Sequence, residues 1–119
     1  MANILAADDS PSIQKMVTLT LEACGHDVTV ADDGVLALEE AQDDEFDFII
    51  TDINMPNMGG FELIKNLRAL EDYQLTPIIC LTTESSVEYK KQGKEAGANG
   101  WIVKPFDPDE LMKIVERLL

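Results

Sequence analysis

The chain has 119 residues, which is enough for one compact domain and too few for two well-packed ones. With 45% hydrophobic and 27% charged residues its composition is globular, and no apolar stretch approaches the roughly 18 residues of a membrane-spanning helix. The net charge of −14 argues against nucleic acid and anionic membranes as direct partners.

Histidine and cysteine are too scarce for several common kinds of site. His26 is the only histidine, which excludes zinc sites built from several imidazoles and leaves a histidine-based catalytic triad without support. Cys24 and Cys80 follow no metal-binding spacing, so we expect both to be small buried hydrophobic residues. The start, MANILAADDS, lacks the basic and apolar regions of a signal peptide, which predicts a cytoplasmic location.

Strand-like and helix-like segments alternate five times along the chain. In chain order we predict a strand at 4–7, a helix at 11–24, a strand at 28–31, a helix at 35–41, a strand at 48–51, a helix at 61–70, a strand at 77–81, a helix at 85–96, a strand at 101–103 and a helix at 108–118. Apolar strands separated by helices imply a parallel sheet covered on both faces. We therefore expect residues 1–119 to form one doubly wound α/β domain.

The predicted helices differ in how well they are specified. The last has the clearest start, because Asp107 can cap it, Pro108 suits its first turn and Glu110 can complete a capping box. The helix at 85–96 has few apolar residues and carries Gly93 in its interior, which costs about 1 kcal/mol relative to alanine. We expect it to be the least firmly held helix.

Polar side chains follow four of the predicted strands. Asp8 and Asp9 come after the first strand, Asp52 after the third, Thr82 at the end of the fourth and Lys104 after the fifth. Each alone has an ordinary structural explanation as a cap, a strand end or a solvated charge. The carboxyl ends of parallel strands meet at one crevice, however, and three clustered carboxylates raise one another's pKa unless a cation is present.

The predicted cluster suits one particular chemistry. A small, carboxylate-dominated set of oxygen ligands favours Mg²⁺. A magnesium ion, a lysine and a hydroxyl around one more carboxylate are what phosphoryl transfer requires, because its transition state needs positive charge and hydrogen-bond donors. An aspartate can serve as the nucleophile. We therefore predict that Asp52 is a phosphoryl acceptor.

These residues resemble the receiver domains of bacterial two-component response regulators, and among them the single-domain chemotaxis, or CheY-like, type. The resemblance covers essentially the whole chain and implies a flavodoxin-like fold of five helices around five parallel strands in the order 2-1-3-4-5. The matching motifs are Asp8-Asp9 after an apolar strand, Asp52 followed by Asn54, Met55, Pro56 and Gly59-Gly60, Thr82 at the end of the fourth strand, and Lys104-Pro105-Phe106 after the fifth.

The resemblance assigns roles to the residues at the strand ends. Asp52 would accept a phosphoryl group from the phosphohistidine of a partner kinase, and Lys104 would pair with the phosphate. Mg²⁺ would be held by Asp9, Asp52 and the backbone carbonyl of Asn54, with Asp8 acting through water.

The resemblance also implies residues that act after phosphorylation. Thr82 would turn its hydroxyl toward the phosphoryl group, and Trp101 would occupy the position of the switch aromatic. Asn54 and Glu84 would tune loss of the phosphate, and Lys104-Pro105 would be a cis peptide. Trp101 is larger than the usual tyrosine or phenylalanine, so its inward packing is an open question; its short strand alone indicates an ordinary core residue.

The implied function is a switch that is not an enzyme beyond its own phosphoryl transfer and autodephosphorylation. Its partner binding would change through the fourth helix, fifth strand and fifth helix. Expected partners of the monomer are a sensor histidine kinase, a downstream target such as a flagellar motor switch protein, and a phosphatase. Lys90 and Lys94 either face solvent or steer a partner to this surface, and the sequence leaves both interpretations open.

Three other functions share parts of this pattern. A phosphohydrolase of the haloacid dehalogenase type also uses an aspartyl nucleophile with Mg²⁺, but it needs a second acid where Asn54 stands. A nucleotide- or flavin-binding module would be expected to carry a glycine-rich phosphate loop, and none follows the first strand. An adaptor with a degenerate site is disfavoured by the complete set of acids, Thr82 and Lys104.

Overall fold

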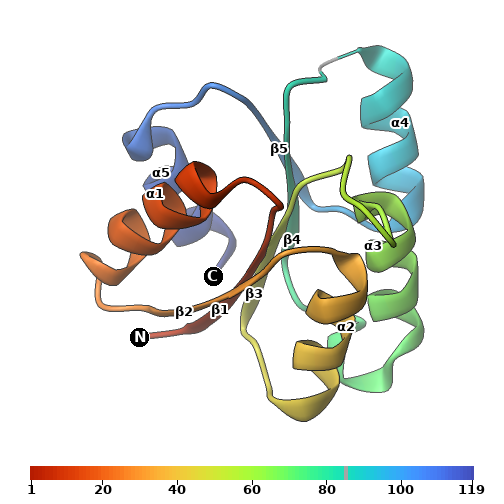
Figure 1. The fold of residues 1–119 in the computed structure, drawn as a ribbon, viewed down its shortest axis with the longest axis horizontal. Helices are drawn as coiled ribbons and strands as arrows, with labels where there is room; N and C mark the ends of the chain where they lie inside the picture. The colour runs from red at the N-terminus through yellow and green to blue at the C-terminus, as the bar shows by residue number, and fades with distance from the viewer. Residues whose placement is uncertain (85) are drawn as a thin grey trace.

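The computed structural model describes residues 1–84 and 86–119. Its centre is a parallel sheet of five strands in the predicted order, β2-β1-β3-β4-β5 (Figure 1). The strands are β1 (Asn3–Ala7), β2 (Asp27–Ala31), β3 (Phe48–Thr51), β4 (Ile78–Thr82) and β5 (Gly100–Val103). All four neighbouring pairs are parallel, so every carboxyl end lies at the same edge of the sheet.

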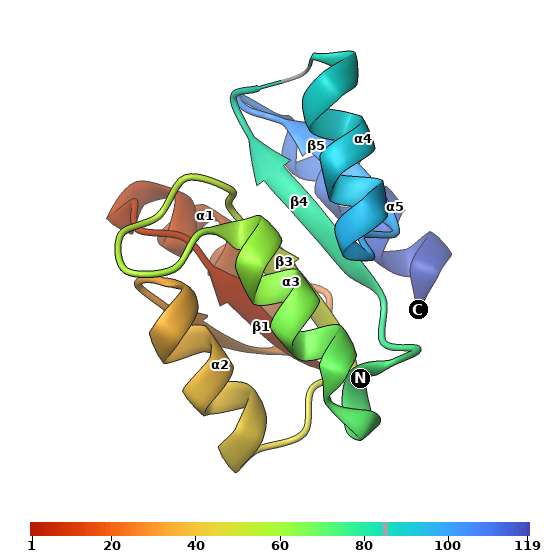
Figure 2. The same cartoon turned by 90° about the vertical axis from the view of Figure 1, so that its right-hand side faces the viewer.

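Five α-helices connect the strands and cover both faces of the sheet. They are α1 (Pro11–Glu22), α2 (Gly34–Asp43), α3 (Gly60–Ala69), α4 (Val87–Ala96) and α5 (Pro108–Leu118), with a short 3-10 helix, η1 (Glu71–Tyr73), after α3. Helices α2, α3 and α4 lie over one face, whereas α1 and α5 cover the other (Figures 1 and 2). The fold is therefore the doubly wound α/β arrangement that the sequence predicts.

The sheet separates two hydrophobic cores. In β3, Ile49 packs into the core beneath α2, α3 and α4, while Phe48 and Ile50 pack into the core beneath α1 and α5. All three side chains are fully buried. A central parallel strand needs apolar residues on both sides, which explains why this segment reads as a continuous apolar run rather than an alternating one.

Several helix ends differ from the prediction. Helix α2 runs from Gly34 to Asp43, beyond the predicted 35–41, because Asp33 caps it by accepting a hydrogen bond from the Leu36 N–H at 2.8 Å. Helix α4 starts at Val87, with Ser86 as its cap, and the predicted first residue, Ser85, lies outside the described residues.

Other local predictions were tested directly. The capping box of Asp107 and Glu110 at the start of α5 is confirmed. The prediction of two buried cysteines was wrong for Cys24, which is exposed because α1 ends at Glu22, whereas Cys80 is buried in β4. Among the described residues, no helix combines the length and apolar character needed to cross a membrane.

Candidate functional site

Backbone hydrogen bonds carry the strand register past the strand ends and so position the polar residues there. The N–H of Asp52 donates to the carbonyl of Ala7 at 2.8 Å, which places Asp52 beside Asp8. The N–H of Lys104 donates to the carbonyl of Thr82 at 2.7 Å. Residues that are far apart in the sequence therefore meet at the carboxyl edge of the sheet.

Three carboxylates converge at this edge, and we call Asp8, Asp9 and Asp52 the carboxyl-edge cluster. One oxygen from each lies within 4.8 Å of the other two. The side chains of Asp8 and Asp52 are buried, whereas Asp9 is exposed at the mouth of the cluster. Within residues 1–84 and 86–119, this is the one group of acidic, histidine or cysteine side chains whose geometry suits a shared metal ion.

Lys104 supplies the positive charge of the cluster. Its Nζ lies 2.7 Å from Oδ2 of Asp8 and 3.4 Å from Oδ2 of Asp52. Backbone donors hold the remaining oxygens, since the Ser10 N–H binds Oδ1 of Asp8 at 2.9 Å and the Ile53 N–H binds Oδ1 of Asp52 at 2.7 Å. Both buried carboxylates are thus fixed in orientation, and one lysine lies between them.

The single ammonium group of Lys104 does not fully offset the burial of Asp52 and its repulsion by Asp8. Burial raises the pKa of Asp52 above its ordinary value, and the nearby charge of Asp8 raises it further, while Lys104 and the Ile53 N–H lower it in part. The net shift is upward. A divalent cation would favour the ionised carboxylates, so the donor set fits a hard ion such as Mg²⁺.

The loop after β3 explains the glycine pair that follows the acidic residue. The N–H of Gly60 donates to the carbonyl of Ile53 at 2.8 Å, and this turn brings the Gly60 backbone against the Asp52 carbonyl, where any Cβ would collide. The predicted cis peptide between Lys104 and Pro105 is confirmed on the other side of the cluster.

The loop after β3 is also held by contacts with the start of α2, which the sequence analysis did not predict. Asn57, whose φ of 68° is left-handed, donates from its side-chain amide to Oδ2 of Asp33 at 2.7 Å. The Gly34 N–H also donates to the Met58 carbonyl at 3.1 Å. The helix cap at Asp33 was recognisable from the Asp-Gly pair before an apolar run, but its pairing with Asn57 depends on tertiary structure.

The other predicted residues lie around the cluster at different depths. Thr82 is 1% exposed, and its hydroxyl accepts a hydrogen bond from the Glu84 N–H at 3.2 Å. The side chains of Asn54 and Glu84 are exposed near the site. Trp101 is partly buried and packs against the core beneath α2, α3 and α4.

Lys90 and Lys94 do not join the carboxyl-edge cluster. Both are exposed on α4, and together with Trp101 they line a shallow depression of about 220 Å³ between α4 and β5. The structure therefore places these lysines beside Trp101, on the surface formed by the fourth helix and the fifth strand.

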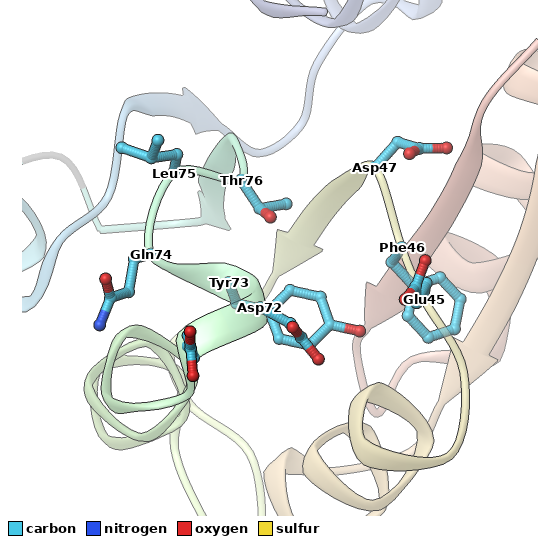
Figure 3. A pocket seen from close by; sticks show the side chains of 9 residues that line it. Glu45, Phe46, Asp47, Asp72, Tyr73, Gln74, Leu75 and Thr76 are labelled. Atoms are coloured by element: carbon cyan, nitrogen blue, oxygen red, sulfur yellow. The ribbon is translucent and has the colours of Figure 1, made fainter.

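A second acidic region lies at the opposite, amino edge of the sheet. Glu45, Asp47, Glu71 and Asp72 line a groove of about 490 Å³, which we call the amino-edge groove (Figure 3). These side chains are exposed. Tyr73 also lines the groove, and its hydroxyl oxygen lies 2.7 Å from the carbonyl oxygens of both Ala41 and Asp44 at the end of α2.

Comparison with known proteins decides the family. Residues 4–116 match the model of the response regulator receiver domain. The chain belongs to this family. A chemotaxis protein, CheY-3 of Vibrio cholerae, is 41% identical to it over 97% of this chain and 92% of that protein.

Solved structures agree with this assignment. The chemotaxis response regulator CheY4 of Vibrio cholerae superposes with a TM-score of 0.96 at 52% identity, covering 100% of this chain and 99% of that one. The receiver domain of a sensor histidine kinase from Pseudomonas aeruginosa has a TM-score of 0.91 at 31% identity, over 98% and 96% of the two chains, and holds a magnesium ion in its active-site cleft.

This receiver domain is a phosphorylation-activated switch of a two-component system that closely resembles CheY chemotaxis proteins. It is a signalling domain, which decides against the phosphohydrolase and the nucleotide-binding module as alternatives. Asp8, Asp9 and Asp52 lie together at the carboxyl edge, and the ammonium group of Lys104 lies near both Asp8 and Asp52.

Proposed function

We propose that Asp52 is the phosphoryl acceptor of this receiver domain. The observation that best supports the proposal is the convergence of Asp52, Asp8 and Lys104: Asp52 is 8% exposed, lies 3.4 Å from the lysine ammonium and shares the carboxyl-edge cluster with two further acids. A nucleophilic carboxylate needs a fixed orientation and positive charge for the incoming phosphoryl group, and these contacts supply both.

In the proposed reaction, a carboxylate oxygen of Asp52 attacks the phosphorus atom of a phosphohistidine. The new O–P bond forms as the N–P bond breaks, and the imidazole nitrogen keeps the electron pair. Lys104 balances charge on the phosphoryl oxygens, and the Ile53 N–H holds the other oxygen of Asp52.

We further propose that Asp8, Asp9, Asp52 and the Asn54 carbonyl hold the metal ion. Their oxygen donors suit Mg²⁺, which keeps part of its water shell and accepts few carboxylates. When bound, the ion supplies positive charge to the phosphoryl oxygens.

The proposed output passes through Thr82 and Trp101 to the surface formed by α4, β5 and α5. Thr82 ends β4 beside the cluster, and Trp101 lies on the neighbouring strand, paired with Cys80. Lys90 and Lys94 flank Trp101 on α4, where they can attract an acidic segment of a partner. Partner binding and phosphorylation then favour each other reciprocally.

We propose that the domain acts between a kinase and a target protein. We expect the phosphoryl donor to be a chemotaxis-type sensor histidine kinase and the target to be a protein such as a flagellar motor switch component. A phosphatase is a further expected partner, and the domain, residues 1–119, would act as a monomer. We place it in the cytoplasm, because an ATP-dependent kinase would supply the phosphohistidine there.

We propose that the domain itself promotes hydrolysis of the phosphoryl group on Asp52. Asn54 and Glu84 are exposed in the loops that follow β3 and β4, and we propose that their side chains act on the water molecule that hydrolyses phosphorylated Asp52. The proposed autodephosphorylation is therefore tuned by these two residues and needs no further catalytic group of the chain.

Labelling with acetyl phosphate tests the acceptor assignment. The wild-type protein should become phosphorylated in the presence of Mg²⁺, and intact mass should rise by one phosphoryl group. Asp52→Asn should abolish this labelling, because the amide cannot act as the nucleophile. The exposed groove variant Asp72→Asn is the matched control and should label like the wild type. Undiminished labelling of Asp52→Asn would refute the proposal.

A further inference from the structure

Gly93 occupies an unusual place in α4. It is buried in the middle of a ten-residue helix, where glycine is disfavoured relative to alanine. The helix has few other buried residues, so this position contributes directly to its contact with the rest of the domain. A glycine at such a point leaves room for another group to approach the helix backbone closely.

The approaching group is the indole of Trp101. A Cβ at position 93 would lie 2.8 Å from Cζ3 and 3.3 Å from Cε3 of Trp101, and 3.4 Å from Cε1 of Phe61. Cζ3 and Cε3 belong to the six-membered ring that tryptophan has in addition to its pyrrole ring. The volume that an alanine methyl group would need is therefore occupied by the part of the indole that points toward α4.

Aromatic contacts extend this packing across three elements. Phe61 of α3 stacks on Trp101 with ring centroids 6.5 Å apart and an angle of 30° between the rings. Tyr89 of α4 meets Phe61 edge-on at 5.7 Å. Figure 2 shows α3 and α4 side by side over this face of the sheet. The indole consequently lies where α3, α4 and β5 meet.

One feature of Trp101 opposes this inward position. Its Nε1 is buried and has no hydrogen-bond partner among the residues that the structure describes. An indole N–H that loses water without gaining an acceptor is destabilising, and rotation of the side chain toward solvent would restore its hydration. The packing against Gly93 favours the inward position, whereas the N–H favours the outward one.

We infer that Gly93 is a positioning residue for Trp101: the missing side chain at position 93 admits the indole beneath α4 and couples the placement of this helix to the position of the ring. The consequence for output rests on the proposed switch function, but the packing relation itself does not. Movement of the indole would leave a void against Gly93, and closing this void would require α4 to shift toward the sheet.

A double-mutant cycle tests the packing relation. With Trp101 present, Gly93→Ala should raise the unfolding equilibrium constant about 5- to 30-fold, because the cost of overpacking by the methyl group exceeds the about five-fold gain from the helix propensity of alanine. In the Trp101→Phe background the same change should lower that constant about five-fold, because alanine is the better helix former. Urea unfolding followed by circular dichroism measures all four proteins. An equal effect of Gly93→Ala in both backgrounds would overturn the inference.

Fluorescence provides a second, independent test. Trp101 is the only tryptophan, so its emission reports this site alone. Gly93→Ala should shift the emission to longer wavelength and make it more sensitive to acrylamide quenching, because the ring is displaced toward water. Gln92→Ala, at an exposed position of the same helix, is the matched control and should behave like the wild type. Unchanged quenching in a folded Gly93→Ala protein would contradict the inference.

A third measurement separates this inference from the proposed function. Beryllofluoride with Mg²⁺ should change Trp101 emission in the wild type, and the change should be at least halved in Gly93→Ala while acetyl phosphate labelling stays the same. A full emission change in the variant would refute the coupling to α4. Failure of labelling in every protein would refute the proposed acceptor but leave the double-mutant cycle valid.

Discussion

The two edges of the sheet both carry several acidic side chains, but in different physical surroundings. At the carboxyl edge, Asp8 and Asp52 are buried and share one lysine, with Asp9 close by. At the amino edge, the four acids of the groove are exposed around a hollow that Tyr73 also lines (Figure 3). The hollow at the amino edge is larger than the depression beside Trp101, yet the proposed phosphoryl-transfer site lies at the opposite edge.

The comparison shows that convergence and loss of water, rather than the number of acids, make a reactive site. Exposed carboxylates are screened by solvent and salt, so they tolerate one another at little cost. Carboxylates that share a buried edge repel one another strongly, so a nearby cation stabilises them. Burial and this repulsion raise the pKa of Asp52. The following predictions test this difference, in order of decreasing effect.

Removal of the shared lysine should have the largest effect. Lys104→Ala should slow acetyl phosphate labelling by about 100-fold or more, because a preorganised positive group next to the phosphoryl oxygens is lost. Labelling rates at saturating Mg²⁺ measure this effect. Lys113→Ala, on the exposed face of α5, is the control and should label at the wild-type rate. Equal rates for the two variants would remove Lys104 from the proposed mechanism.

Magnesium should stabilise the folded protein only by binding to the carboxyl-edge cluster. At a concentration 100 times its Kd, Mg²⁺ should raise the free energy of unfolding by about 2.7 kcal/mol. Asp9→Asn should remove most of this gain, whereas Asp72→Asn in the amino-edge groove should retain it. Thermal unfolding across a magnesium titration measures both. Persistence of the full gain in Asp9→Asn would show that the ion binds elsewhere.

The raised pKa of Asp52 gives a pH-dependent prediction. The folded protein binds the Asp52 proton more tightly than the unfolded chain, so ionised Asp52 lowers stability above the raised pKa, and this loss disappears as the pH falls. Without Mg²⁺ at pH 7, Asp52→Asn should therefore stabilise the protein and raise its Tm, because the amide removes the charge that burial and Asp8 disfavour. The gain should shrink toward pH 4, and thermal melts at several pH values measure it. A gain that grows on acidification would contradict the assigned shift.

Neutralising the amino-edge groove should have the smallest effect. Glu45→Gln and Asp72→Asn should each change the free energy of unfolding by less than about 0.5 kcal/mol, because their side chains are exposed. Any gain should fall at 1 M salt, where exposed charges are screened. Urea unfolding at two salt concentrations measures this. A change above 2 kcal/mol would mean that the two acidic regions are more alike than their burial indicates.

Much of the fold was predictable because its signals are local. The apolar run Phe48–Ile50 is buried on both sides as a central strand must be, and the cap at Asp107 depends only on neighbours in sequence. The acidic positions were predictable for a related reason. In a parallel sheet the strand ends share one edge, so a residue that follows a strand is placed by the topology alone.

Other features could not be predicted because they depend on pairs that meet only in the folded chain. The pairing of Asn57 with Asp33 and the stacking of Phe61 on Trp101 have no local signal. The sequence marked Gly93 as a weak point of α4, and the structure shows it to be the place where the indole fits.

The amino-acid sequence by itself determined which residues end the strands and therefore the identity of the acids, hydroxyl and lysine at the carboxyl edge. Hydrophobic periodicity and helix capping involve residues close together in the sequence, so they can be recognised without the structure. Only the tertiary structure decided that Asp8 and Asp52 lose water together around Lys104 and that Trp101 packs under α4. Desolvation and steric fit are properties of groups brought together in space.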